Sequence, residues 1–166
     1  MTISIRSITG TTQCAAVLAA FTLGHTARAA DSVTVSVPAF LGFNVVDVTR
    51  STPGAPSPFS VMFSDAVLGP GDSIRMSVQA NTSDFIPPAG PAIPVTNVTW
   101  TTSNAVRSTG SSGTLLSDSY SQVLISNPNA ASGSVDLAWT LAAPGGGIRA
   151  GNHTLTASWK VESVSP

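Results

Sequence analysis

The sequence of 166 residues contains a single cysteine, Cys14, and only two histidines, His25 and His153. One thiol cannot form an intramolecular disulfide, so a disulfide scaffold is excluded. A zinc site needs several histidine or cysteine ligands, and this chain has too few of them. The fold must therefore depend on the packing of apolar side chains.

Charge is also scarce, since Asp, Glu, Lys and Arg make up only 9% of the residues. The seven basic residues form no cluster along the chain, so we expect neither nucleic acid nor an anionic membrane as a partner. The hydrophobic fraction of 42% is high for a disordered chain of low charge. These proportions favour a folded domain whose surface is covered mainly by Ser and Thr.

No apolar run is long enough to cross a bilayer as a helix, including the short run 14–23. Arg6 precedes that run without any acidic residue, and the small-x-small sequence Ala27-Arg28-Ala29 follows it. This pattern predicts a signal peptide at residues 1–29, and a secreted, periplasmic or cell-surface location. An uncleaved anchor or the first helix of the fold is the alternative.

The predicted mature chain, residues 30–166, is long enough for one domain with a substantial core. It has five basic and eight acidic side chains, a net charge of −3, and no cysteine. We expect no integral membrane segment after cleavage.

The clearest structural pattern lies in residues 135–163. Apolar residues alternate with polar ones on both sides of a Pro-Gly-Gly-Gly loop at 144–147. A period of two is typical of strands with one buried face. The pattern predicts a long hairpin with Trp139 and Trp159 on its inner face.

Six further segments predict strands: 32–37, 40–49, 59–63, 73–80, 95–102 and 120–126. The first is a candidate edge strand, because it opens the mature chain and has a polar outer face. Proline and glycine predict surface loops at 50–58, 81–94 and 104–113. Seven or eight short strands without a helix predict an all-β, two-sheet antiparallel sandwich of immunoglobulin-like type. A single sheet closed on itself is the alternative.

The three tryptophans, Trp100, Trp139 and Trp159, are candidates for a sugar-stacking platform. Each falls at a position of its strand that shares parity with apolar neighbours. We therefore expect all three rings in the core rather than on the surface.

Few residues of this chain are candidates for a catalytic or metal-binding role. A serine nucleophile needs a neighbouring base, and His153 is the only histidine of the mature chain. Asp65, Asp72 and Asp84 lack the close spacing of a calcium loop, and we interpret them as solvated loop acids. We expect no catalytic residue, no cofactor and no metal site.

A resemblance is carried by Trp139-Thr140-Leu141, by Pro144, and by the start of the last strand at 150–156. These roughly 30 residues resemble exported bacterial β-sandwich surface domains, of the WxL-type cell-wall-binding or fimbrial-type kind. The resemblance implies a cell-surface protein. It assigns no residue a role, because Trp100-Thr101-Thr102 departs from the Trp-x-Leu pattern.

These observations predict a non-catalytic exported structural or surface-assembly protein with protein partners or self-association. Residues 31–37 are the candidate strand for pairing with a neighbour. A carbohydrate- or cell-wall-binding module, using the tryptophans or the loops 81–94 and 104–113, is the second hypothesis. A hydrolase that depends on His153 is the third.

Overall fold

A computed structural model describes residues 2–8, 32–87, 90–148 and 150–166. The predicted all-β class is confirmed over these residues, in which the only helical element is a single 3₁₀ turn, η1 (Val95–Asn97). The leader features at 14–23 and 27–29 lie outside the described residues.

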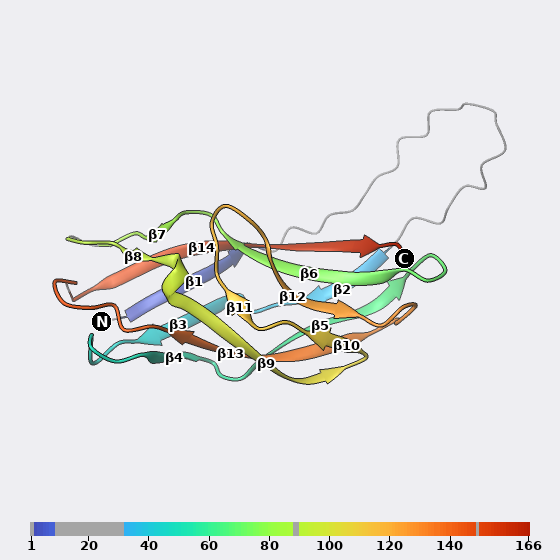
Figure 1. Cartoon of the computed structure of the whole chain (residues 1–166), viewed down its shortest axis with the longest axis horizontal. Helices are drawn as coiled ribbons and strands as arrows, with labels where there is room; N and C mark the ends of the chain where they lie inside the picture. The colour runs from blue at the N-terminus through green and yellow to red at the C-terminus, as the bar shows by residue number, and fades with distance from the viewer. Residues whose placement is uncertain (1, 9–31, 88–89, 149) are drawn as a thin grey trace, which may run out of the picture.

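Twelve strands form one continuous sheet that curls over a single core (Figure 1). Its strands are β1 (Thr2–Ile8), β2 (Ser32–Ser36), β3 (Phe40–Asn44), β4 (Thr52–Ala55), β5 (Phe59–Val67), β6 (Ser73–Ala80), β9 (Val98–Val106), β10 (Ser108–Gly110), β11 (Gly113–Thr114), β12 (Ser121–Ser126), β13 (Gly133–Leu141) and β14 (Asn152–Val164). The short strands β7 (Asp84–Phe85) and β8 (Ile93–Pro94) pair separately.

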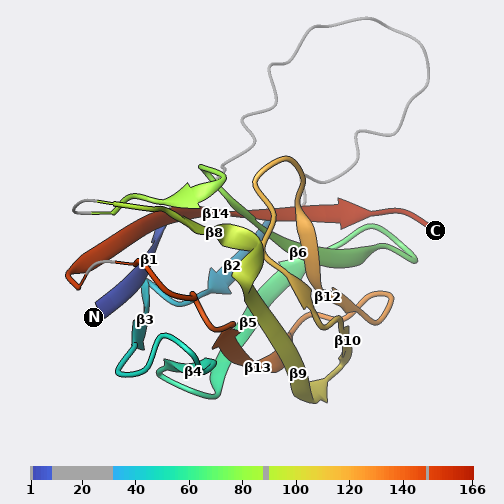
Figure 2. The ribbon, with the colours of Figure 1, turned by 60° about the vertical axis from the view of Figure 1, so that its left-hand side comes forward.

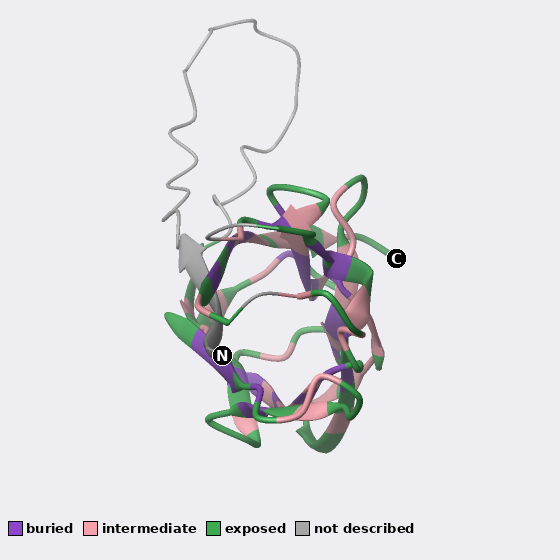
Figure 3. Ribbon diagram, turned by 90° about the vertical axis from the view of Figure 1, so that its left-hand side faces the viewer, coloured by how far each residue is buried: buried purple, intermediate pink, exposed green. Residues whose placement is uncertain are grey.

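Strand β4 joins the two halves of the curled sheet. One half has the order β10-β12-β6-β14-β1-β3, and β4 pairs with β3 at its end. In the other half β13 pairs with β4, β5 and β9, and β2 follows β5. Every pairing is antiparallel except that of β1 with β14. Figure 3 looks along the molecule and shows the strands arranged around the core.

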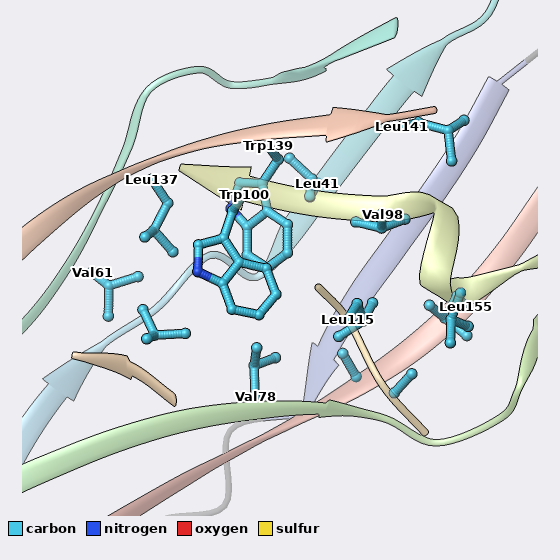
Figure 4. Close-up of a cluster of buried hydrophobic side chains, with 14 of the residues drawn as sticks. Leu41, Val61, Val78, Val98, Trp100, Leu115, Leu137, Trp139, Leu141 and Leu155 are labelled. Atoms are coloured by element: carbon cyan, nitrogen blue, oxygen red, sulfur yellow. The ribbon is translucent and has the colours of Figure 1, made fainter. Parts of the chain in front are cut away.

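The core forms where alternating residues of facing strands meet, as the period of two predicts. In β6, Ile74, Met76 and Val78 are buried, and in β13 all of the odd-numbered positions from Gly133 to Leu141 are buried. Figure 4 shows side chains from both halves of the sheet gathered around Trp100 and Trp139. The packing of these apolar faces against each other holds the fold without a disulfide.

The prediction that residues 135–163 form a hairpin is wrong. Strand β13 pairs with β4, β5 and β9, whereas β14 pairs with β6 and β1, so the two arms lie in different halves of the sheet. The connection is long and contains Gly145 and Gly147 at positive φ values of 84° and 88°. Such a connection lets the chain cross over the core, so that the inner faces of both arms point at each other.

Three loop predictions are also wrong in part. Strand β9 continues to Val106 and β10 follows at once, so most of the predicted loop 104–113 is extended chain. The predicted loop 81–94 contains the β7–β8 pair, in which Phe85 and Ile93 are buried. In the third predicted loop, β4 occupies Thr52–Ala55. Pairing partners that are distant in the sequence override the local Pro, Gly and Ser signals here.

The edge position of residues 32–37 is confirmed. Among the strands that the structure describes, β2 stands at the end of the strand order and pairs only with β5. Figure 2 shows it beside β5.

Candidate functional site

Two of the three tryptophans lie in the core, as predicted. Trp100 is 2% exposed and Trp139 is 3% exposed, and their ring centroids are 4.9 Å apart (Figure 4). The indole Nε1 of Trp100 donates a hydrogen bond to the carbonyl oxygen of Ser111 at 2.7 Å. Since buried rings cannot stack on a ligand, these two do not form a sugar platform.

Trp159 departs from the prediction, because it is only partly buried. It lines a mainly apolar cavity of about 20 Å³ together with Pro38, Leu41, Ala157 and Trp139. That volume is near the size of one water molecule and far below that of a sugar ring. The alternation of β14 continues through Trp159, but there the strand has passed the deepest part of the core.

His153 lies near the start of β14 and has no exposed surface. A general base must come within hydrogen-bond reach of a substrate proton. A substrate cannot reach His153 in this arrangement, so the geometry gives no support to the hydrolase hypothesis.

The three candidate loop acids do not converge. Asp72 is 1% exposed, which contradicts its interpretation as a solvated acid, and its Oδ2 lies 3.4 Å from the Ser163 hydroxyl. Asp65 is exposed and Asp84 is half-buried. Over the described residues, no group of three or more His, Cys, Asp and Glu side chains is arranged to hold a metal ion.

The most organised polar contact on the outer face involves Asp136. Its carboxylate accepts hydrogen bonds from the Ser60 hydroxyl and, at 2.8 Å, from the Asn104 amide. These bonds, chiefly the one from Ser60, hold the pKa of Asp136 below its usual value. The three residues come from the neighbouring strands β5, β9 and β13, so the contact links these strands on the outer face.

The feature with the clearest capacity for recognition is the strand position between β3 and β14. Strand β1 fills it, pairing in parallel with β14 over seven positions and antiparallel with β3 over five. Figures 1 and 2 both show β1 lying alongside β14 and β3. We call this place the β3–β14 position.

The walls of the β3–β14 position are apolar on the core side except at His153. On β14 the buried residues are His153, Leu155 and Ala157, and on β3 they are Leu41, Gly42 and Phe43. Register positions 3 and 5 of β1 pair with His153 and Leu155 on one side and with Phe43 and Leu41 on the other. Paired residues share a face of a sheet, so an incoming strand needs apolar residues at these two positions.

Chemically, the β3–β14 position holds an extended segment, which in the structure is β1. Two strand edges supply backbone N–H and C=O groups, and the core-side positions supply selectivity for alternate side chains. The sequence signal for it was the alternation of Ile3 and Ile5 with Thr2, Ser4 and Arg6. This signal does not identify the position from the sequence alone, because the leader pattern at residues 1–29 accounts for the same residues.

A scan of protein-family models and a comparison with curated proteins gave no match to this chain. The described part of the chain contains no helix with the length and apolar character that crossing a bilayer requires.

Proposed function

We propose that the protein is an exported, non-catalytic structural subunit that associates with copies of itself at the cell surface. Its mature domain is an immunoglobulin-like sandwich on this proposal. The observation that carries it is the state of β2, an edge strand that opens the predicted mature chain and pairs only with β5.

The contacts of β2 suit a strand that can exchange partners. It pairs at only four positions, with an irregularity between Ser32 and Thr34. Val33 and Val35 are half-buried against the core, and the alternate residues are exposed. Few buried apolar contacts and an open edge mark a segment of low local stability. Such an edge is a template for pairing with another chain.

The surface supports the same role. The exposed positions of β5 and of β9, which lies beyond β13 in the same half of the sheet, include Ser60, Thr99 and Thr101 and few charges. Without long charged side chains on this face, two molecules can approach without burying unpaired charges.

The test is the oligomeric state of the chain 30–166 with and without residues 31–37. We expect oligomers of the intact chain by sedimentation velocity, and a monomer after the deletion. A chain lacking only Ser165 and Pro166, which are exposed at the other terminus, should assemble as the intact chain does. Oligomers that survive the deletion of residues 31–37 would refute the role of this strand, and a monomeric intact chain would refute self-assembly.

A carbohydrate- or cell-wall-binding module is the second candidate, and one surface feature favours it. A hollow of about 250 Å³ is lined by amide, hydroxyl and apolar groups of Asn81, Thr82, Ile86, Thr154, Leu155 and Thr156. Ile86 is 63% exposed there. Pull-down on peptidoglycan and on a glycan array tests this candidate. Retention that Asn81→Ala with Ile86→Ala abolishes would support it, and lack of retention by the intact chain would exclude it.

A further inference from the structure

The β3–β14 position is filled by residues that the predicted signal peptide contains. Strand β1 spans Thr2–Ile8, and cleavage after Ala29 would remove it. The exported chain would then lack pairing at seven positions of β14 and five of β3. Backbone groups at a buried edge need partners, and water can serve them only if it enters the core.

If β1 is removed, core residues on both sides give the empty β3–β14 position an apolar lining. Phe43 and Leu155 have at most 2% of their surface exposed while β1 is present. Removing one strand between them would expose apolar surface from both walls, which the hydrophobic effect opposes. The exported chain therefore has a strong preference for a replacement strand.

Residues 32–37 have the pattern of the strand they would replace. Thr2-Ile3-Ser4-Ile5 alternates hydroxyl and β-branched residues, and Ser32-Val33-Thr34-Val35 does so in the same phase. In the register of β1, Val33 would take position 3 and Val35 position 5, the two core-side places. Thr34 would then lie beside Thr154, at the place of Ser4.

The β3–β14 position offers this segment more backbone pairing than its present place at the edge of the sheet does. At the end of the sheet β2 has one neighbour and four paired positions. Between β3 and β14 it would have a neighbour on each side. Its valines, half-buried at present, would also lie in register with wall residues that are buried.

The segment cannot easily reach the position within its own molecule. In the register of β1, Ser36 would face Phe40, which leaves residues 37–39 as a three-residue hairpin loop. Such loops place their first residues in the helical region and their last in the left-handed region. Pro38 disfavours the helical region for Val37, and Ala39 is unsuited to a left-handed conformation. Pro38 is also buried, where it shares a cavity with Ala157 and Trp159 of β14.

We propose that the β3–β14 position of the exported chain accepts residues 32–37 of a second copy, parallel to β14 and antiparallel to β3. This rests on the proposed function, and it names the surface through which the subunits join. Donor and acceptor are different surfaces, so the contact is head-to-tail, and it extends into a chain of subunits unless the exchange is reciprocal or the rotation between copies closes a ring.

The test mixes two variants of the chain 30–166, which has no other cysteine. Thr34→Cys carries an affinity tag and Thr154→Cys carries none, and both substituted residues are exposed. The two are unfolded in urea, refolded together and oxidised. We expect a disulfide-linked heterodimer at about ten times the yield of a control mixture of Thr34→Cys with Thr101→Cys, because only the paired positions bring two sulfurs within bonding distance. Thr101 is an exposed residue of β9, remote from the β3–β14 position in the strand order.

The outcomes separate this inference from the proposed function. Oligomers without the Thr34–Thr154 heterodimer would contradict the proposal that the β3–β14 position accepts residues 32–37. They would remain consistent with self-assembly. A monomeric intramolecular disulfide in a Thr34→Cys/Thr154→Cys chain would show that the segment folds back in its own molecule, and would overturn the second-copy occupant. A monomeric chain at every concentration would contradict both self-association and the contact at the β3–β14 position.

A peptide gives an independent measurement. A synthetic peptide of residues 2–8 has the sequence that fills the β3–β14 position, so it should suppress heterodimer formation when added during refolding. The same peptide with Ile5→Lys places a charge at a core-side position and should not compete. Equal effects of the two peptides would contradict the proposal.

Discussion

At the scale of single residues, the fold depends on close approaches that no pattern of hydrophobicity reveals. Gly54 lies on β4, the strand that joins the two halves of the sheet. A Cβ added there would lie 2.8 Å from Leu41 Cδ1 and 3.0 Å from Trp139 Cβ. The absence of a side chain at this position lets β4 pack tightly over the tryptophan pair of the core.

We expect Gly54→Ala to lower the free energy of unfolding by about 1–3 kcal/mol, since an extra methyl group overpacks the core. Urea denaturation followed by tryptophan fluorescence measures this difference. Gly146→Ala is the matched control, because no atom lies within 4 Å of a Cβ built there. Equal stabilities of the two variants would show that the contacts around Gly54 relax without cost.

At the scale of elements, the decisive feature is the path of the chain from β13 to β14. Periodicity identified both strands and their buried faces but suggested that they pair with each other. In the structure they face each other across the core, with β13 paired to β9 and β14 paired to β6. Two inner faces rich in large apolar residues bury more area against each other than side by side in one sheet.

Cysteine pairs test this arrangement in the chain 30–166. Thr101 and Ala138 are paired across β9 and β13, so Thr101→Cys/Ala138→Cys should form a disulfide on mild oxidation. Thr140→Cys/Thr154→Cys would be bridged in a direct β13–β14 hairpin, and we expect its thiols to stay free in the monomer. Thiol titration and electrophoretic mobility measure both. A disulfide between Cys residues introduced at Thr140 and Thr154 would instead support direct pairing of β13 with β14.

At the scale of the whole molecule, the boundary of the folded domain depends on the fate of the leader. The chain that retains Thr2–Ile8 has a complete sheet, and the chain that begins at Ala30 has a vacant strand position. On the proposal that residues 1–29 are removed, the exported domain therefore gains stability from a partner strand, whereas a chain that keeps β1 already has that position filled. A partner that binds only the folded state raises its stability in proportion to the logarithm of its concentration.

Mass spectrometry of the exported chain tests the boundary. We expect a first residue of Ala30, because Ala27-Arg28-Ala29 fits the small-x-small requirement of the processing enzyme. Ala27→Leu with Ala29→Leu should block processing, whereas Arg28→Lys should not. An exported chain that still contains Thr2–Ile8 would show that β1 is a permanent strand of the domain, and the β3–β14 position would then be closed to partners.

The sequence by itself determined the all-β class, most strand positions and the burial of Trp100 and Trp139, because a period of two reports directly which face of a strand is covered. It also identified β2 as an edge strand from its place in the chain and its polar outer face. Only the tertiary structure decided which strands pair, that Asp72 is buried while Trp159 is half-exposed, and that residues 2–8 fit between β3 and β14. Pairing depends on contacts between residues far apart in the chain, and local patterns carry no information about which distant edge a strand will meet.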